Sequence, residues 1–108
     1  MTYELEFSAN VHHAGENVTV RLGTKWLRRL AVGDQIVLHG DDGTRRPATV
    51  RGRIACRVAD IPPDLLLVEH DRSCRCPEGL LAELERLYGE ANMNSLVTVI
   101  VYAVPNAE

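Results

Sequence analysis

The segment that most constrains the fold is the run Leu96–Val104, which reads LVTVIVYAV. Successive side chains of a strand point to opposite faces, so a run that is apolar at odd and even positions buries both of its faces. We therefore predict a central strand with structure packed on each side. The run is too short to cross a bilayer, and Thr98 and Tyr102 interrupt it, so we expect no membrane-spanning segment here.

Four earlier segments show the alternation of a strand with one buried face. They are Tyr3–Phe7, Val18–Leu22, Gln35–His39 and the stretch 48–58. In the last of these we predict one core-facing side and one basic outer stripe, formed respectively by Ala48, Val50, Ile54, Cys56 and Val58, and by Thr49, Arg51, Arg53 and Arg57. The run Gly40–Gly43, with two aspartates inside it, is typical of a hairpin turn.

Helices are expected between these strands. Thr24 is suited to cap a short helix, and the segment 62–70, which opens on two prolines, suggests a second. Pro77 then begins a longer helix over Glu78–Tyr88, which Gly89 ends. Five strands and two or three short helices in this order predict an α+β fold, a small mixed β-barrel, with residues 1–108 forming a single domain.

Composition is compatible with such a domain. The chain has 108 residues, of which 45% are hydrophobic and 25% charged, enough for a core without disulfides. Its three cysteines form no even-numbered framework, and the acidic opening Met1–Glu4 does not resemble a signal peptide. We therefore expect a cytoplasmic protein, and favour a monomer while leaving the oligomeric state open.

Charge is unevenly distributed along the chain. Residues 17–59 contain nine lysine and arginine residues against three aspartates, whereas residues 60–108 contain three arginines against nine acidic residues. A basic half suggests a partner that carries phosphate groups, such as RNA. The alternative is that folding interleaves the two halves, so that no basic surface survives.

Several motifs occur in a characteristic order. The segment 14–21 reads AGENVTVR and is followed by 30–38, LAVGDQIVL; later come Glu69-His70, the run GLLAEL at 79–84 and VTVIVY at 97–102. In this order and spacing the chain resembles ASCH domains, which belong to the PUA-like superfamily. The resemblance covers roughly residues 3–104, by the element boundaries above.

The resemblance implies a PUA-like barrel with a cleft for RNA or a modified nucleoside. Some ASCH proteins are amidohydrolases that deacetylate N4-acetylcytidine with a loop lysine, the threonine of a Thr-x-Arg motif and a later glutamate. Thr19 and Arg21 match that motif, but Glu16 stands at the lysine's place, and Glu69 is the nearest candidate for the later glutamate. The catalytic candidates are thus Thr19, Glu16 and Glu69, and the sequence leaves open whether this chain is an enzyme.

A binding function relies on cationic side chains, because arginine forks suit both phosphates and base edges. Lys25 is the only lysine and lies with two arginines on one side of the predicted short helix. The candidate ligand-binding residues are Arg21, Lys25, Arg28, Arg29, Arg51, Arg53 and His13. The alternative is that these cations pair with Glu4, Glu6 or Glu16. With few aromatic residues, extensive base stacking is not expected, and Trp26 is assigned to the core.

His70, Cys74 and Cys76 are closely spaced candidate ligands for a metal ion. Structural zinc requires four nitrogen or sulfur ligands, and Cys56, the remaining cysteine, is predicted to face the core. We therefore expect no metal and no cofactor.

A second resemblance gives a rival interpretation. The segments 17–21 and 30–38 are also similar to the swapped-hairpin DNA-binding modules of AbrB-type regulators, although about seventy further residues follow. That interpretation predicts a dimer that binds duplex DNA.

Overall fold

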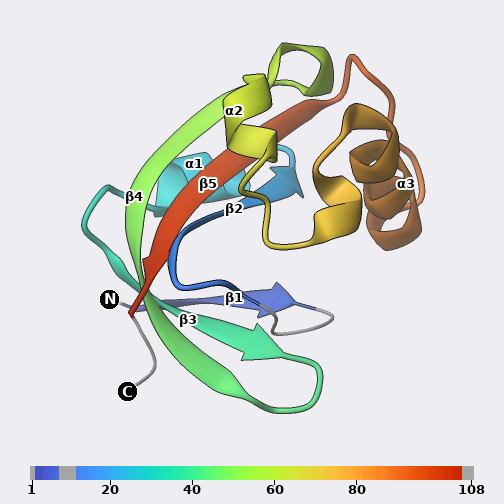
Figure 1. Cartoon of the computed structure of the whole chain (residues 1–108). Coiled ribbons are helices and arrows are strands. Elements are labelled where there is room, and N and C mark those ends of the chain that lie inside the picture. The colour runs from blue at the N-terminus through green and yellow to red at the C-terminus, as the bar shows by residue number, and fades with distance from the viewer. Residues whose placement is uncertain (1, 8–11, 106–108) are drawn as a thin grey trace.

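The computed structural model describes residues 2–7 and 12–105, which form one curled, mixed sheet with helices at its margins (Figure 1). The strands are β1 (Tyr3–Phe7), β2 (Gly15–Leu22), β3 (Gln35–Gly40), β4 (Arg45–Arg57) and β5 (Leu96–Val104). Their order in the sheet is β1-β3-β4-β5-β2. Among these neighbouring strands, β1 and β3 pair in parallel, and the other three pairs are antiparallel. The predicted α+β fold with five strands is therefore confirmed.

Three short helices and two 3₁₀ turns connect the strands. They are α1 (Lys25–Arg29), η1 (Val58–Asp60), α2 (Pro63–Leu66), η2 (Arg72–Cys74) and α3 (Pro77–Tyr88). In Figure 1, α1 and α3 lie on opposite sides of the molecule, and α2 lies above the middle of the sheet. Within the described part of the chain, no helix has the length and apolar character needed to cross a membrane.

Strand β5 is central, as its sequence predicts. It pairs with β4 on one side and with β2 on the other. Ile100 and Tyr102 belong to one buried cluster, which includes residues of β1, β3 and β4, whereas Val97 and Val99 belong to a second cluster with α3 and β2. The sheet therefore has a core on each face, and β5 contributes to both.

The prediction that the apolar residues of β4 all face one core is wrong. A β-bulge shifts the register between Val50 and Gly52, so that Val50 lies opposite Tyr102 but Ile54 lies opposite Val99. Because Tyr102 and Val99 belong to different cores, the bulge moves the alternation of β4 from one face to the other. Ile54, which was expected to face the same core as Val50, is 40% exposed.

Helix α3 begins and ends at the predicted residues. Proline occupies the first position, where its missing N–H costs nothing, and Gly89 ends the helix with a φ of 89°. Leu80 and Leu84 are buried against the second core. Leu87, further along the same helix, is half exposed and lines the cavity described below.

Candidate functional site

A cavity of about 990 Å³ lies between the ends of β1 and β2, the segment around Glu69 and helix α3. The wall includes Phe7 of β1, the pair His12 and His13, residues 19–21 of β2, and the inner side of α3. Four segments that are distant in the sequence thus converge on one hollow.

Strand β2 supplies two of the predicted residues. Thr19 and Arg21 are two positions apart, so they point to the same face of the strand, and both line the cavity. Thr19 is 3% exposed, and the Nε–H of Arg21 donates a hydrogen bond to its Oγ1 at 3.2 Å. The guanidinium carbon of Arg21 lies 4.6 Å from the centroid of the Phe7 ring. Burial lowers the pKa of Arg21 below its usual value.

Glu69 is placed by backbone contacts with β2. The Val18 amide donates to the Val68 carbonyl at 2.9 Å, and the His70 amide donates to the Val18 carbonyl at 3.0 Å. These bonds form an isolated parallel bridge between Val18 and Glu69 on the outer edge of the sheet. Glu69, some fifty residues after Thr19 in the sequence, therefore lines the same cavity.

The Glu69 carboxyl group is almost completely buried, with 2% of its residue surface exposed. Burial raises its pKa to about 8, although the Asp71 amide, which donates to Oε1 at 3.0 Å, and the charges of Arg21 and Arg75 oppose the rise. Nε2 of His70 lies 3.3 Å from the same oxygen. At neutral pH the group is mainly a neutral carboxylic acid, able to donate a hydrogen bond as well as to accept one.

Two histidines join an aromatic cluster around Phe7. The ring centroids of His12 and His70 lie 4.9 and 4.8 Å from that of Phe7, with interplanar angles of 90° and 88°. Nδ1 of His12 lies 2.8 Å from the hydroxyl oxygen of Tyr102. Burial, with the nearby His70 and Arg46, lowers the pKa of His12 to about 4, so its imidazole is neutral at pH 7.

The cavity has mixed charge. Its wall carries five acidic residues (Glu6, Asp41, Glu69, Asp71 and Glu83) and four arginines (Arg21, Arg72, Arg75 and Arg86). Arg86 and Glu83 neutralise each other in a 2.7 Å ion pair. The expectation of a basic cleft therefore does not describe this hollow.

The basic side of α1 lies elsewhere. Lys25, Arg28 and Arg29 do not line the cavity, although the sequence suggested that they would share it with Arg21. The cationic groups of Lys25 and Arg29 lie 5.2 and 5.7 Å from the Trp26 ring, which packs edge-on against Tyr3. Helix α1 packs on β4 and β5, whereas α3, which lines the hollow, lies on the other side of the molecule (Figure 1).

The remaining predicted residues are divided in the same way. His13 lines the cavity, whereas Glu16, Arg51 and Arg53 do not. Glu16 is exposed near the start of β2, opposite Ala103. Arg51 is exposed at the bulge of β4, and Arg53 donates through Nε to the carbonyl of Leu30 at the end of α1.

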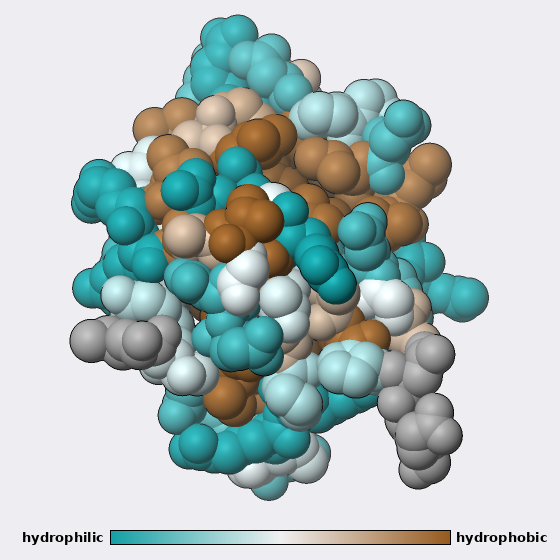
Figure 2. Space-filling view, turned by 90° about the vertical axis from the view of Figure 1, so that its left-hand side faces the viewer, coloured by the Kyte–Doolittle hydropathy of each residue, from teal (hydrophilic) through white to brown (hydrophobic). Residues whose placement is uncertain are grey.

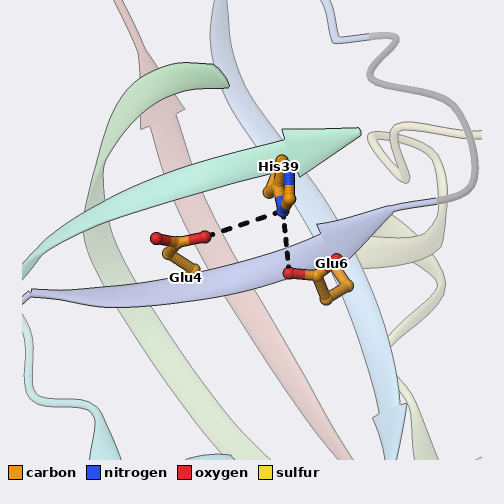
Figure 3. Close-up of side chains that lie close together, drawn as sticks. All are labelled: Glu4, Glu6 and His39. Carbon is orange, nitrogen blue, oxygen red and sulfur yellow. Dashed lines mark hydrogen bonds and ion pairs between the residues drawn. The ribbon is translucent and has the colours of Figure 1, made fainter. Parts of the chain in front are cut away.

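The cysteines do not assemble the considered metal site. Cys74 is buried, which raises its pKa to about 12, whereas Cys76 is exposed. The described residues contain a group of three possible ligands on the outer face of β1 and β3, where Nδ1 of His39 lies 3.6 Å from Glu4 and 3.0 Å from Glu6 (Figure 3). Glu4 also pairs with Arg45 at 3.1 Å. These contacts are exposed cross-strand ion pairs, and one member of the group, Glu6, also lines the cavity.

Phe7 and His12 are not among the predicted site residues, and His70 is named only in the Glu69-His70 motif and as a candidate metal ligand. The alternation of Tyr3–Phe7 placed Phe7 in the core, which is correct at 4% exposure. That its ring would meet both histidines depends on long-range packing. The adjacent pair His12-His13 was the one local signal.

The curled five-stranded sheet, with short helices at its margins and a cavity at one side, is an ASCH/PUA-like α+β fold. Among solved structures, the chain is similar to the ASCH domain from Lactobacillus crispatus JV V101, with a TM-score of 0.66 and 13% sequence identity. The match covers 95% of this chain and 79% of that chain. At this identity the likeness shows the fold alone. No family model and no curated protein matches the sequence.

The AbrB-type interpretation is wrong for the fold. It required the two strands around residues 17–38 to form a hairpin module. In the structure β2 pairs with β5, and β3 pairs with β1 and β4. Both strands belong to one five-stranded sheet within a single chain.

Proposed function

We propose that this domain binds a nucleoside, free or as one residue of an RNA chain, in the cavity beside β2. The observation that carries the proposal is the convergence of Thr19, Arg21 and Glu69, three residues singled out from the sequence, on the wall of one hollow. The ASCH resemblance implies this class of ligand, and the ASCH-like fold supports that resemblance.

The chemistry of the wall suits a nucleobase. Arg21 is a fixed cationic donor, while the Thr19 hydroxyl and the neutral Glu69 carboxyl can each donate or accept a hydrogen bond. Base edges present both donors and acceptors, and the partly exposed ring of His70 offers a flat surface beside these polar groups. A cavity of about 990 Å³ is large enough for a nucleoside and for part of a neighbouring residue.

Isothermal titration calorimetry with cytidine, uridine and N4-acetylcytidine tests this proposal. We expect at least one of them to bind, and Arg21→Gln or Thr19→Val to weaken that binding about tenfold or more, because each removes a polar group from the wall. Arg57→Gln is the matched control, since Arg57 is exposed and paired with Asp60 at 3.0 Å. The proposal would be contradicted if none of the three nucleosides bound, or if the wild type and all variants bound with equal affinity.

If the nucleoside belongs to an RNA chain, the cations outside the cavity gain a function. Lys25, Arg28, Arg29, Arg51 and Arg53 lie on α1 and β4, which are in contact. In the described part of the chain, no carboxylate forms an ion pair with any of the five. Figure 2, which views the molecule from the left-hand side of Figure 1, shows hydrophilic residues interleaved with hydrophobic ones rather than one apolar face. We propose that these cations contact backbone phosphates.

Fluorescence anisotropy with a fluorescein-labelled oligouridylate tests the RNA component separately from the cavity. Affinity should fall as salt rises, and Arg28→Gln/Arg29→Gln should reduce the salt slope by about one to two units. Arg45→Gln/Arg57→Gln is the control, because both of these arginines have acidic partners. Salt-independent binding, or a preference for duplex DNA by a dimer, would contradict it. A monomeric state and a cytoplasmic location are predictions of the same proposal.

A second candidate function is hydrolysis of an N4-acylated cytidine, favoured by the placement of Thr19, Arg21 and Glu69 in one cavity. In this mechanism Oγ1 of Thr19 attacks the acyl carbon, the bond from that carbon to N4 breaks, and N4 takes up a proton to leave as cytidine. Water then cleaves the threonine ester and releases the carboxylate. Arg21 would stabilise the oxyanion, and Glu69 would accept the threonine proton once ionised. Glu16, exposed outside the cavity, has no part in this mechanism.

Incubation with N4-acetylcytidine, followed by chromatography, distinguishes the enzyme from the binding module. The enzyme releases cytidine and acetate, Thr19→Ala abolishes release, and turnover rises with pH toward 8 because Glu69 must ionise. Binding of N4-acetylcytidine without any turnover in the folded protein would leave the binding function and eliminate this one.

A further inference from the structure

Phe7 is a core residue whose ring contacts three side chains of the cavity wall, those of Arg21, His12 and His70. Its ring lies 4.6 Å from the Arg21 guanidinium carbon and is perpendicular to the imidazoles of His12 and His70, with centroids within 4.9 Å. It is also tilted against the ring of Tyr102, at 6.2 Å. These four partners come from β2, β5 and two loops.

Phe7 is itself fixed by the sheet. It is the last residue of β1, paired with Gly40 of β3, and its carbonyl accepts a hydrogen bond from the Asp41 amide at 3.1 Å. Only 4% of its surface is exposed, so most of the ring is covered by protein and little remains for a ligand. Its contribution to the cavity is therefore made through its neighbours.

We propose that Phe7 is a positioning residue of the ligand site, whose ring holds Arg21, His12 and His70 in the orientations that a nucleoside meets. This inference rests on the proposed function, because it assigns a role in nucleoside binding. Arg21 is the central partner. Its Nε–H is bonded to Thr19 while its cationic plane lies by the ring, so the two contacts together fix the guanidinium.

An aliphatic residue at position 7 would fill a similar volume but would not attract the Arg21 cation as an aromatic ring does. The attraction between a cation and an aromatic ring depends on the negative face of the ring, and it increases when the cation is partly removed from water. Arg21 is partly buried, so it meets that condition. Fluorination withdraws electron density from the face while it nearly preserves shape, so it separates positioning from packing.

Fluorination can be confined to this one ring, because Phe7 is the only phenylalanine in the chain. Biosynthetic incorporation of mono-, di- and trifluorinated phenylalanine therefore alters one ring. With the nucleoside that wild-type protein binds, we expect affinity to fall stepwise with fluorine content, by about tenfold in total. The melting temperature should stay nearly constant across the series. Unchanged affinity across the series, or losses that follow the melting temperature, would overturn the inference.

A readout without ligand keeps the inference testable if no nucleoside binds. The ring current of Phe7 should shift the NMR signal of the Arg21 Nε–H in the free protein, and fluorination should accelerate exchange of this proton with water. Phe7→Leu should remove the shift. An Nε–H signal that has the same position and exchange rate in wild type, in the fluorinated series and in Phe7→Leu would overturn the inference. Failure of nucleoside binding alone would instead contradict the proposed function.

A third experiment measures the energetic coupling between Phe7 and Arg21. If Phe7 acts through Arg21, the fluorinated ring should weaken nucleoside binding in wild type but have little further effect in the Arg21→Gln background. Arg57→Gln is the matched background in which the full effect should persist, because Arg57 and its partner Asp60 do not line the cavity. Equal losses in the Arg21→Gln and Arg57→Gln backgrounds would overturn the positioning role.

Discussion

Glu69 is joined to Val18, the residue that precedes Thr19, by an isolated parallel β-bridge on the open edge of β2. Two backbone hydrogen bonds of 2.9 and 3.0 Å flank this bridge, so the position of Glu69 does not depend on its own side chain. The sheet edge thus presents a hydroxyl and a buried carboxyl group to the same cavity. The pH behaviour of the domain follows from this placement.

The first prediction concerns stability against pH. Glu69 has a pKa of about 8 in the folded protein and about 4.5 when unfolded, so the folded state binds more protons between these values. The free energy of unfolding therefore falls as pH rises through this window. His12 acts in the opposite sense, since its folded pKa of about 4 lies below 6.5, and its contribution rises with pH between those values.

The two groups oppose each other below pH 6.5, and above it only Glu69 of this pair still titrates. Urea denaturation of wild type and Glu69→Gln should therefore diverge between pH 6.5 and 8, with wild type losing on the order of 1–2 kcal/mol relative to the variant. The difference between the two profiles removes the contribution of the other histidines. Parallel profiles over this range would mean that the Glu69 carboxyl is already ionised.

The second prediction concerns Gly79 in α3. A Cβ at this position would overlap the carbonyl oxygen of Ser73 in η2 and approach Sγ of Cys76 at 3.4 Å. Alanine improves helix propensity by about 1 kcal/mol, but relief of a backbone overlap requires movement of η2, so the steric cost should prevail. We expect Gly79→Ala to reduce the free energy of unfolding by about 3 kcal/mol.

Gly52→Ala is the control for this prediction. Its added Cβ would meet only Val101, at an ordinary contact distance of 3.8 Å, and should change stability by less than about 1 kcal/mol. Thermal or urea unfolding of both variants gives the comparison. Equal effects of the two substitutions would show that α3 and η2 do not approach each other as described.

The third prediction concerns cysteine reactivity. Cys76 is exposed at the start of α3, whereas Cys74 is buried with a pKa of about 12 and thus contains little thiolate. Burial also raises the pKa of the half-buried Cys56. Alkylation by iodoacetamide at pH 8, followed by mass spectrometry, should modify Cys76 first and Cys74 about a hundredfold or more slowly. Rapid modification of Cys74 in the folded protein would contradict its burial.

The fourth prediction concerns the cluster of Glu4, Glu6 and His39 on the outer face of β1 and β3. All three are at least partly exposed, and water and salt weaken such ion pairs. His39→Gln should therefore change the free energy of unfolding, measured by urea denaturation, by less than about 1 kcal/mol. A loss of several kcal/mol in this variant would show that the cluster contributes more than exposed ion pairs do.

Local signals predicted most of the elements. The two-sided apolar pattern of Leu96–Val104 required partners on both sides and cores on both faces, and Pro77 with Gly89 bounded α3. Strand β4 was less predictable, because a bulge at residues 50–52 moves its alternation to the other face. Gly52 is a cue for such a bulge, but a glycine alone does not say whether the register shifts.

The candidate site was predictable only in part. Thr19 and Arg21 share a face because they are two residues apart on a strand, which is a local property. The approach of Glu69 depends on its bridge to Val18, and the meeting of Phe7 with His12 and His70 depends on tertiary packing. Likewise, the basic side of α1 is expected at the cleft because it follows Arg21 in the sequence, whereas α1 packs on β4 and β5 and contributes no residue to the cavity wall.

The proposed function requires that a nucleoside occupies the cavity beside β2. Titration of ¹⁵N-labelled protein with cytidine or N4-acetylcytidine, observed by NMR, maps the contact directly. We predict saturable shifts of the backbone amides of Thr19, Arg21, Glu69 and His70, with those of Lys25–Arg29 unchanged. Shifts confined to α1 and β4, or no saturable shifts with either nucleoside, would contradict the account.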